Sequence, residues 1–312
     1  MNFNKFLQIL IAILFCVLIP LGVEAVVLYL EPSQGQYQLG DTFIAEARID
    51  TEEECINTVE ANLSFSQDVL RAVDFSQGNS ILTIWVKPPE INQELGLISF
   101  VGGIPGGYCG ALPGEPGEPT LLGRIALRAI DETDTKQNTK PHEKIAKLQF
   151  LDSSQVLLND GLGTPAKLTR KGAVFTILAE KLEVPKEEWQ EELKKDNIPP
   201  EPFEIEIQQD PAIFEGKYFI IFSTTDKQTG IDYYEIKEGK RNWKRVTSPY
   251  LLEDQDLKSI IKVKAVDKAG NERIAEYTPE ILKKPFPYWI IIIIILVLVI
   301  VGWIIYKIIR KR

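Results

Sequence analysis

The glycine-rich stretch 101–119 is the first place where this sequence could carry out chemistry. It reads VGGIPGGYCGALPGEPGEP and holds seven of the 21 glycines. Such a loop can cradle phosphate, and a cysteine within it can act as a nucleophile or form a disulfide. The phosphate loop is excluded, because Gly107 is followed by Tyr108 and Cys109 instead of Lys and Ser or Thr. Two consecutive Gly-Glu-Pro triplets are also too few for collagen.

The cysteines favour a structural role. Cys16 lies in an apolar N-terminal run, which leaves Cys55 and Cys109 in the remainder of the chain. Two cysteines in an oxidising compartment predict one disulfide. No recognisable motif brings a histidine to Cys109, so we expect no nucleophile there. Tyr108, in a glycine-rich segment that we expect to form no strand, is predicted to be exposed and is a candidate binding residue.

Other candidate binding and metal residues carry weaker patterns. Trp85 could stack on a sugar ring, although aromatic side chains more often fill the core of a β-sandwich. Asp254-x-Asp256 and Asn159-Asp160-Gly161 have the beginning of a calcium loop, but neither continues with the spacing of an EF-hand. The sequence therefore predicts no metal site and no cofactor. The single histidine, His142, completes no catalytic set, so we do not expect an enzyme.

Both ends of the chain have the composition of membrane-targeting segments. Residues 1–25 have an early lysine, an apolar run and small residues before Ala25, as in a cleavable signal peptide. Residues 288–306 carry no charge and are flanked by aromatic residues, which predicts a transmembrane helix. The basic tail 307–312 predicts a cytoplasmic C-terminus. We therefore expect a single-pass cell-membrane protein whose N-terminal domains lie outside the cell.

The charge excludes nucleic acid as a partner. The formal net charge is −9, and the basic residues of the tail lie outside the predicted exterior region. An acidic exterior does not suit binding to a phosphate backbone.

The predicted exterior contains two β-rich regions. Residues 26–177 hold many short runs of β-branched and aromatic residues separated by turn sequences, which predicts an all-β sandwich. Residues 178–202 predict a linker with either one short helix or no regular structure. Residues 203–280 predict about seven short strands in a smaller immunoglobulin-like sandwich, with a hairpin turn at 267–271. This smaller sandwich is expected to be a stalk.

The first region resembles the cohesin family. The resemblance rests on an ordered set of segments: YLEPSQGQYQLGDTFIAEARID at 29–50, NTVEANLSF at 57–65 followed by DVL, GLISF at 96–100, LGRIALRA at 122–129 and VLLNDG at 156–161. It implies a jelly-roll sandwich related to carbohydrate-binding modules. Cohesins bind dockerins through one sheet face and assemble polysaccharide-degrading complexes. The glycine-proline loop, the cysteine pair and the charged loop 131–144 depart from the family pattern, so no dockerin-binding residue is carried over. The segment SIIKVKAVDKAGN at 259–271 resembles bacterial immunoglobulin-like or fibronectin-III-like surface domains.

These observations predict a membrane-anchored cell-surface binding protein. Its cohesin-like sandwich would hold a protein partner, either dockerin-like or another surface protein, or a polysaccharide, with a link to polysaccharide breakdown. The alternative is a purely structural or adhesive envelope protein without a specific glycan ligand.

Overall fold

The computed structural model describes residues 25–110, 120–131, 143–179 and 184–279, together with positions 293, 295–298, 300, 301 and 303. Several predicted features therefore lie outside the described residues: the signal peptide up to residue 24, the end of the glycine-proline loop, His142, most of segment 288–306 and the tail 307–312. Within the described residues, no helix is both long and apolar enough to cross a membrane.

The chain forms two compact units. The first comprises residues 1–201 together with two later segments, 224–232 and 265–273. The second comprises residues 202–223, 233–264 and 274–312. Each unit is described by itself below.

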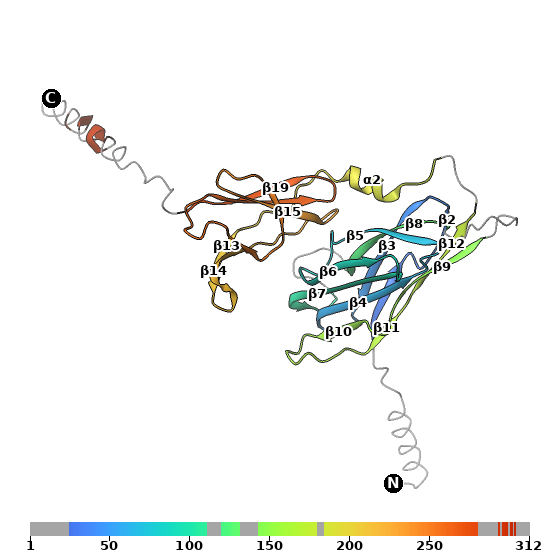
Figure 1. Cartoon of the computed structure of the whole chain (residues 1–312). Coiled ribbons are helices and arrows are strands. Elements are labelled where there is room, and N and C mark those ends of the chain that lie inside the picture. The colour runs from blue at the N-terminus through green and yellow to red at the C-terminus, as the bar shows by residue number, and fades with distance from the viewer. Residues whose placement is uncertain are drawn as a thin grey trace, which may run out of the picture. The chain divides into compact units, whose positions relative to one another are not determined.

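Residues 26–178 form two β-sheets. The smaller sheet has five strands in the order β11-β1-β3-β8-β5, and the larger has the order β2-β12-β9-β4-β7-β6, with β10 paired to β4 (Figure 1). The strands of the smaller sheet are β1 (Val26–Glu31), β3 (Thr42–Asp50), β5 (Leu70–Ser76), β8 (Leu121–Ala129) and β11 (Leu168–Arg170). Those of the larger sheet are β2 (Gln34–Gln38), β4 (Ile56–Phe65), β6 (Ile84–Asn92), β7 (Leu97–Tyr108), β9 (Lys144–Phe150), β10 (Gln155–Leu158) and β12 (Ala173–Leu178).

Alternation of apolar side chains explains how the two sheets pack. Along β3, the side chains of Phe43, Ala45 and Ala47 are fully buried, whereas those between them are partly exposed. Successive side chains of a strand point to opposite faces, so one face of each sheet becomes apolar. The inward faces of both sheets contribute to one apolar core, as expected for a β-sandwich.

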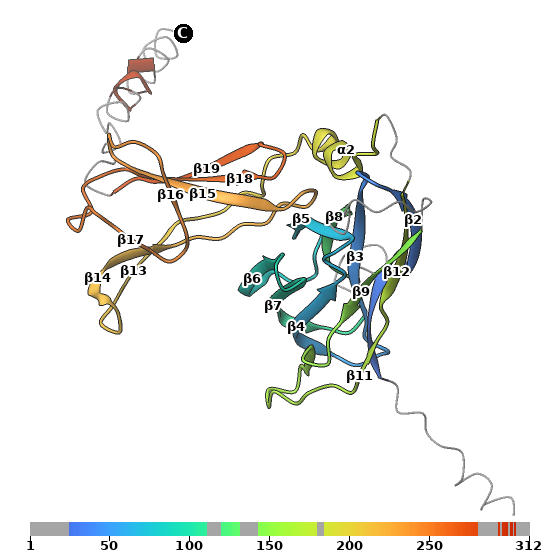
Figure 2. The same cartoon turned by 45° about the vertical axis from the view of Figure 1, so that its right-hand side comes forward.

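A short helix follows the sandwich. Helix α2 (Glu188–Lys195) has acidic residues in its first turn and Lys194 and Lys195 in its last turn, which complements the helix dipole. Trp189 is buried. The sequence left open whether this segment is helical, and the structure has a helix there (Figure 2).

The remaining strands form two small sheets. One has the order β13-β14-β17 and the other β16-β15-β18-β19. Their bounds are β13 (Glu206–Asp210), β14 (Ile213–Ile221), β15 (Ile231–Glu238), β16 (Lys244–Val246), β17 (Tyr250–Leu251), β18 (Ile261–Asp267) and β19 (Glu272–Tyr277). Six buried apolar residues form the core between them, and Ile220 and Val263 are fully buried. The predicted hairpin turn joins β18 to β19. The immunoglobulin-like classification stays a prediction.

Candidate functional site

The glycine-rich stretch forms a strand in its first part. Strand β7 runs through Tyr108 and pairs with β4 along most of its length. Tyr108 is 1 % exposed and belongs to the apolar core. The expectation that Tyr108 is exposed in a strandless loop is therefore wrong. A ring buried this deeply offers no surface on which a sugar could stack.

The reason lies in the inward positions of β7. Ile98, Phe100, Gly102 and Ile104 alternate toward the core, so the strand period continues through the glycines. Gly102 is required there, because an added Cβ would lie 2.7 Å from the Leu82 side chain. The glycines therefore make room for core side chains in addition to permitting turns.

The predicted disulfide is confirmed. Cys55 and Cys109 are joined, with a Cα–Cα distance of 4.2 Å, next to the final Ile56–Tyr108 pair of the β4–β7 ladder. Asn159 fastens the same place, because its backbone N–H donates to the Cys55 carbonyl at 2.8 Å and its side-chain amide donates to the Gly106 carbonyl at 3.1 Å. The disulfide therefore closes the end of the ladder.

Trp85 lies at an edge of the larger sheet. It is partly buried against the core, with ring centroids 5.7 Å from Phe100 and 6.3 Å from Phe75. Its half-buried ring contributes to the packing of the sandwich, and a binding role of Trp85 stays a prediction.

The larger sheet presents a second face that points away from the core. We call it the outer face. Ile84, Ile145 and Val174 lie on it, with 52 %, 56 % and 44 % of their side chains exposed. The register places them with polar side chains of neighbouring strands, namely Thr58, Glu60, Asn62, Ser64, Lys87, Ser99 and Lys147. The outer face of the sheet thus carries exposed aliphatic groups among both uncharged and charged polar side chains.

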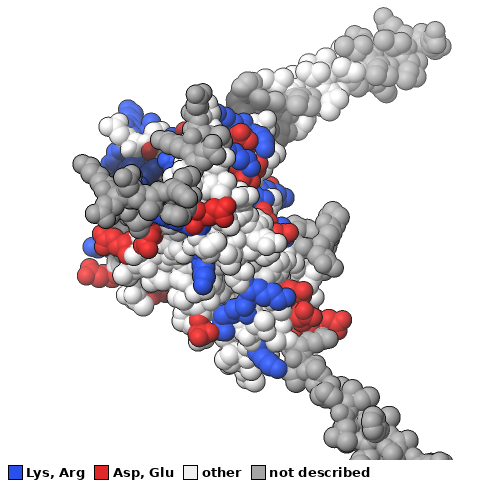
Figure 3. Space-filling view, turned by 90° about the vertical axis from the view of Figure 1, so that its right-hand side faces the viewer, with Lys and Arg blue, Asp and Glu red and all other residues white. Residues whose placement is uncertain are grey.

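The view onto the β2, β12 and β9 side of the sandwich shows how charged and uncharged residues are distributed there. Uncharged residues cover much of its centre, and charged side chains lie mainly around them (Figure 3). The exposed aliphatic side chains of β9 and β12 are Ile145 and Val174. The centre of a protein interface is depleted of charged residues relative to its rim.

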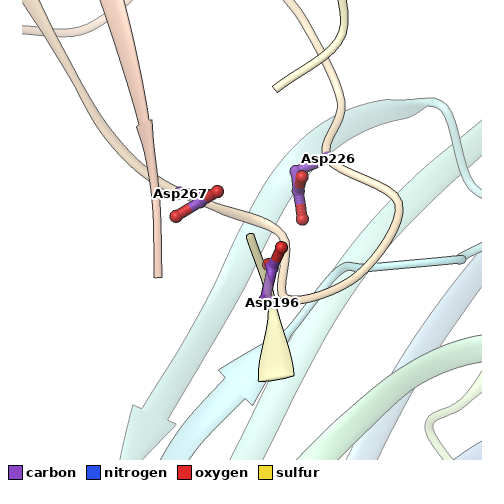
Figure 4. A group of neighbouring side chains, drawn as sticks. All are labelled: Asp196, Asp226 and Asp267. Carbon is purple, nitrogen blue, oxygen red and sulfur yellow. The ribbon is translucent and has the colours of Figure 1, made fainter. Parts of the chain in front are cut away.

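Three aspartates form a separate cluster within the first compact unit. Asp196 follows helix α2, Asp226 lies in the segment before β15, and Asp267 ends β18. One carboxylate oxygen of each lies within 4.8 Å of the others. Figure 4 shows the three side chains converging from three separate segments of the chain. They are 7 %, 3 % and 1 % exposed, respectively.

Hydrogen bonds fix each carboxylate of this cluster. Asp226 Oδ1 accepts from three successive backbone N–H groups, those of residues 228 to 230, at 2.8–3.0 Å. Asp196 accepts from the Thr229 hydroxyl at 2.6 Å and from the backbone of Ile198. Asp267 accepts from the backbone and the side-chain amide of Asn271, which also donates to the Asp196 carbonyl at 3.4 Å. The cluster is therefore preorganised by its own loops.

The environment of Asp267 disfavours its charged form. Burial raises the pKa of Asp267, the hydrogen bonds from Asn271 oppose this rise, and the charges of Asp196 and Asp226 add to it. Buried carboxylates are normally paired with a cation or coordinated to a metal. Oxygen ligands in such a set suit a hard divalent cation.

Sequence reasoning singled out none of these three aspartates as a ligand. They lie 30 and 41 positions apart, at 196, 226 and 267, so no short spacing motif joins them. The available signal was the VDKAGN turn, whose Asp267 and Asn271 are bonded side chain to side chain at 2.9 Å. The sequence of this turn predicts only a hairpin.

The two calcium-like sequences form ordinary turns. The hydrogen bond from the Ser259 hydroxyl, followed by backbone hydrogen bonds from residues 259, 256 and 258, lowers the pKa of Asp254. Asp160 accepts from the backbone of Leu162 in an exposed loop. Both carboxylates cap a turn of their own chain.

Comparison with known proteins gives distant structural likenesses. No family model matches the sequence, and no curated protein matches it. Among solved structures, a type I cohesin–dockerin complex of Clostridium thermocellum matches at 13 % identity and a TM-score of 0.39, covering 50 % of this chain and 95 % of that one. A non-cellulosomal cohesin of Archaeoglobus fulgidus matches at 16 % identity and a TM-score of 0.35, covering 50 % and 93 %. A cohesin module from a family 33 glycoside hydrolase of Clostridium perfringens matches at 14 % identity and a TM-score of 0.34, covering 51 % and 98 %. These proteins belong to the family that the sequence resembles, and their identities and TM-scores carry no argument about what this chain binds.

Proposed function

We propose that this protein is a non-covalent binding module that holds a protein partner on the outer face of its larger sheet. The observation that carries the proposal is the exposure of Ile84, Ile145 and Val174 on that face. Each belongs to a hydrogen-bonded strand, so the surface is ordered before a partner arrives. Preorganisation lowers the entropy cost of association.

The chemistry of the exposed groups favours a protein over a polysaccharide. All exposed large hydrophobic residues in the described parts of 25–179 are aliphatic: Val73, Ile84, Val86, Leu95, Ile145, Leu162 and Val174. Sugars are commonly held by stacking on exposed aromatic rings, whereas aliphatic groups suit the apolar side chains of a protein. The sequence resemblance to cohesins agrees, because that family binds dockerins through a sheet face. A dockerin-like protein is therefore the first partner to test.

We further propose that the module is exported and anchored at the cell membrane. The support is the sequence of residues 1–25 and of the uncharged segment 288–306 with its basic tail. We expect the full chain to sediment with membranes after a high-pH carbonate wash. Protease added outside the cell is expected to release fragments of the exterior domains. Recovery of the full chain in the wash supernatant would contradict the anchor.

The binding face is tested by capture on the full chain, purified in a non-ionic detergent. Immobilised chain is incubated with secreted and surface proteins of the source cells, and with dockerin domains. The test variant is Ile145→Glu combined with Val174→Glu, and the control is Leu162→Glu, an exposed loop position. We expect saturable binding of a discrete protein by the wild type and the control, reduced at least about tenfold in the double variant, because a buried unpaired charge is costly.

The outcomes separate the remaining hypotheses. Equal binding by the double variant and the control would move the interface away from this face. Saturable binding of a purified polysaccharide, unaffected by the double variant, would favour the glycan alternative. A wild type that captures nothing would favour the purely structural envelope protein.

A further inference from the structure

The hairpin between β13 and β14 ends in consecutive exposed apolar residues. These are Pro211, Ala212, Ile213 and Phe214, with Ile213 exposed by 40 % and Phe214 by 36 %. We call these four residues the apolar tip. Figures 1 and 2 both show the turn between β13 and β14 projecting from the other strands of the second compact unit. Single exposed apolar residues are ordinary, whereas a consecutive run is unfavourable in water unless it has a function.

The backbone holds Phe214 in a conformation that a bulky residue rarely adopts. The φ angles of Phe214, Glu215 and Gly216 are 50°, 57° and 75°, which lie in the left-handed region. Of these three residues, only the glycine adopts that region without strain. The segment is nevertheless fixed, because Gln209 Nε2 donates to the Gly216 carbonyl at 2.9 Å. Strained residues that are held in this way cluster at functional sites.

The charged groups beside the apolar tip are engaged with their own neighbours. Asp210 accepts from the backbone N–H of Ala212 at 2.7 Å, and Glu215 pairs with Lys217 at 3.7 Å. The tip itself carries no charge. The tip therefore offers an apolar environment a surface without ionic groups that would have to be desolvated.

Strand β19 ends on the side of the unit from which the tip projects. The Gln255 side chain bonds both backbone groups of Tyr218, at 2.8 and 3.0 Å, which places the loop after β17 beside the tip end of β14. Strand β18 begins directly after this loop, and Lys262 near its start pairs with Glu276 near the end of β19 at 2.8 Å. The chain therefore leaves β19, after Tyr277, toward the same side as the tip.

The sequence after β19 limits the distance between this side of the unit and a membrane. Eight residues, 280–287, separate Pro279 from the predicted transmembrane segment 288–306. Eight fully extended residues span at most about 29 Å. A connection of this length gives an effective concentration on the order of millimolar, so a weak affinity of the tip for the bilayer is sufficient for contact. This step rests on the membrane anchor of the proposed function.

We propose that the apolar tip inserts into the interfacial region of the bilayer in which the chain is anchored. Phe and other apolar side chains are typical of protein surfaces that lie at the boundary between headgroups and acyl chains. The strength of such contacts scales with the apolar area buried, which Ile213 and Phe214 supply. The contact gives the second compact unit a second attachment to the membrane and fixes its orientation there.

The test uses the full chain reconstituted in phosphatidylcholine vesicles, with a nitroxide attached at Ala212→Cys. Electron paramagnetic resonance measures collisions of the nitroxide with O₂, which concentrates in the bilayer, and with a water-soluble nickel complex. We expect collisions with O₂ to exceed those with nickel. The control label, at Leu162→Cys in an exposed loop of the first sandwich, is expected to show the reverse. Labelled wild type corrects for reaction at Cys16.

A second substitution separates membrane contact from folding. Phe214→Asn removes the ring, and Asn tolerates the left-handed conformation. We expect it to reverse the collision ratio at the 212 label. Its melting temperature in detergent is expected to stay close to that of the wild type, because relief of strain offsets the lost contact with Phe219. Leu95→Asn, at a residue of the first sandwich that is 65 % exposed, is the control and should leave the ratio unchanged.

The outcomes distinguish the tip contact from the anchor. A chain that stays in the vesicles through a carbonate wash, but has its 212 label in water, overturns the tip contact alone. A chain that is lost from the vesicles in the wash contradicts the anchor, and the tip contact falls with it. Low collision rates with both reagents would mean that protein covers the tip, and an unchanged ratio in Phe214→Asn would mean that Phe214 does not hold it in the bilayer. Either result overturns the proposal.

Discussion

The two β-rich regions differ in what lies at their centres. Residues 26–178 surround a large apolar core to which both sheets contribute, and a disulfide closes one of the strand ladders. The core of the second region has six buried apolar residues, and Glu238 in this region is a buried carboxylate that accepts from two backbone N–H groups. Small β-rich regions bury too little apolar surface for stability, and supplement it with other links. The difference indicates that polar contacts supplement the smaller apolar core of the second region.

The core of the first sandwich should show the largest effect. Phe100 is fully buried, with its ring 5.1 Å from Phe75 and 5.7 Å from Trp85. We expect Phe100→Ala to lower the free energy of unfolding by about 3–5 kcal/mol, because truncation leaves a cavity. Urea denaturation followed by tryptophan fluorescence measures it. A loss below about 1 kcal/mol would show that this core does not stabilise the sandwich as described.

The disulfide should come next. Cys55 and Cys109 are separated by 54 positions, and a closed loop of this length restricts the unfolded chain by an amount worth about 3–4 kcal/mol. We expect the Cys55→Ser, Cys109→Ser double variant to lose about this much stability. Reduced wild type is the matched control and should unfold at the same urea concentration as the double variant. Equal stability of oxidised wild type and variant would contradict the role of the disulfide.

In the second region, the buried carboxylate of Glu238 tests whether polar contacts stabilise the fold. Glu238 accepts from the backbone N–H groups of Glu253 and Asp254, at 3.1 and 2.9 Å, through different oxygens. Glu238→Gln replaces one acceptor by a donor, so we expect a loss of about 2 kcal/mol in thermal or urea unfolding of this region. Glu276→Gln, at an exposed ion pair with Lys262, serves as the control and should change stability by less than about 0.5 kcal/mol. An equal loss of stability in Glu238→Gln and Glu276→Gln would show that the buried carboxylate does not stabilise this region.

The smallest expected loss of stability concerns the Thr229 hydroxyl, which donates a hydrogen bond to the aspartate cluster. Thr229 is buried, and its Oγ1 donates to Asp196 at 2.6 Å. Thr229→Val keeps the shape but removes this donor, and we expect a loss of about 1 kcal/mol. The measurement is thermal unfolding of the full chain in a non-ionic detergent. An unchanged or raised melting temperature would mean that this hydrogen bond does not stabilise the cluster.

Local sequence patterns predict the strands and the disulfide of the first sandwich. Apolar alternation located the strands, and the cysteine count in the predicted compartment identified the disulfide that the structure contains. The error at Tyr108 came from treating glycines as strand breakers. At Gly102 the decisive factor is the Leu82 side chain, which comes from the connection between β5 and β6 and cannot be located from the local sequence.

The aspartate cluster could not be predicted for a related reason. Asp196, Asp226 and Asp267 are brought together by tertiary packing of segments that are far apart in sequence. Each residue alone has the pattern of a turn or helix-end aspartate, which is the ordinary role of that residue type. Exposed aliphatic residues of the outer face were likewise indistinguishable from core residues until the register of the strands was known.

The central claim is that an apolar core fixes the first sandwich, whereas carboxylates that accept from backbone amides fix the segments 224–232 and 265–273. Hydrogen–deuterium exchange of the full chain, followed by mass spectrometry of the wild type and of Asp226→Ala, tests it most directly. We expect Asp226→Ala to speed exchange in peptides covering 224–232, where Asp226 accepts from three successive amides, and to leave peptides of β4 unchanged. Identical exchange of the 224–232 peptides in the two proteins would contradict the account.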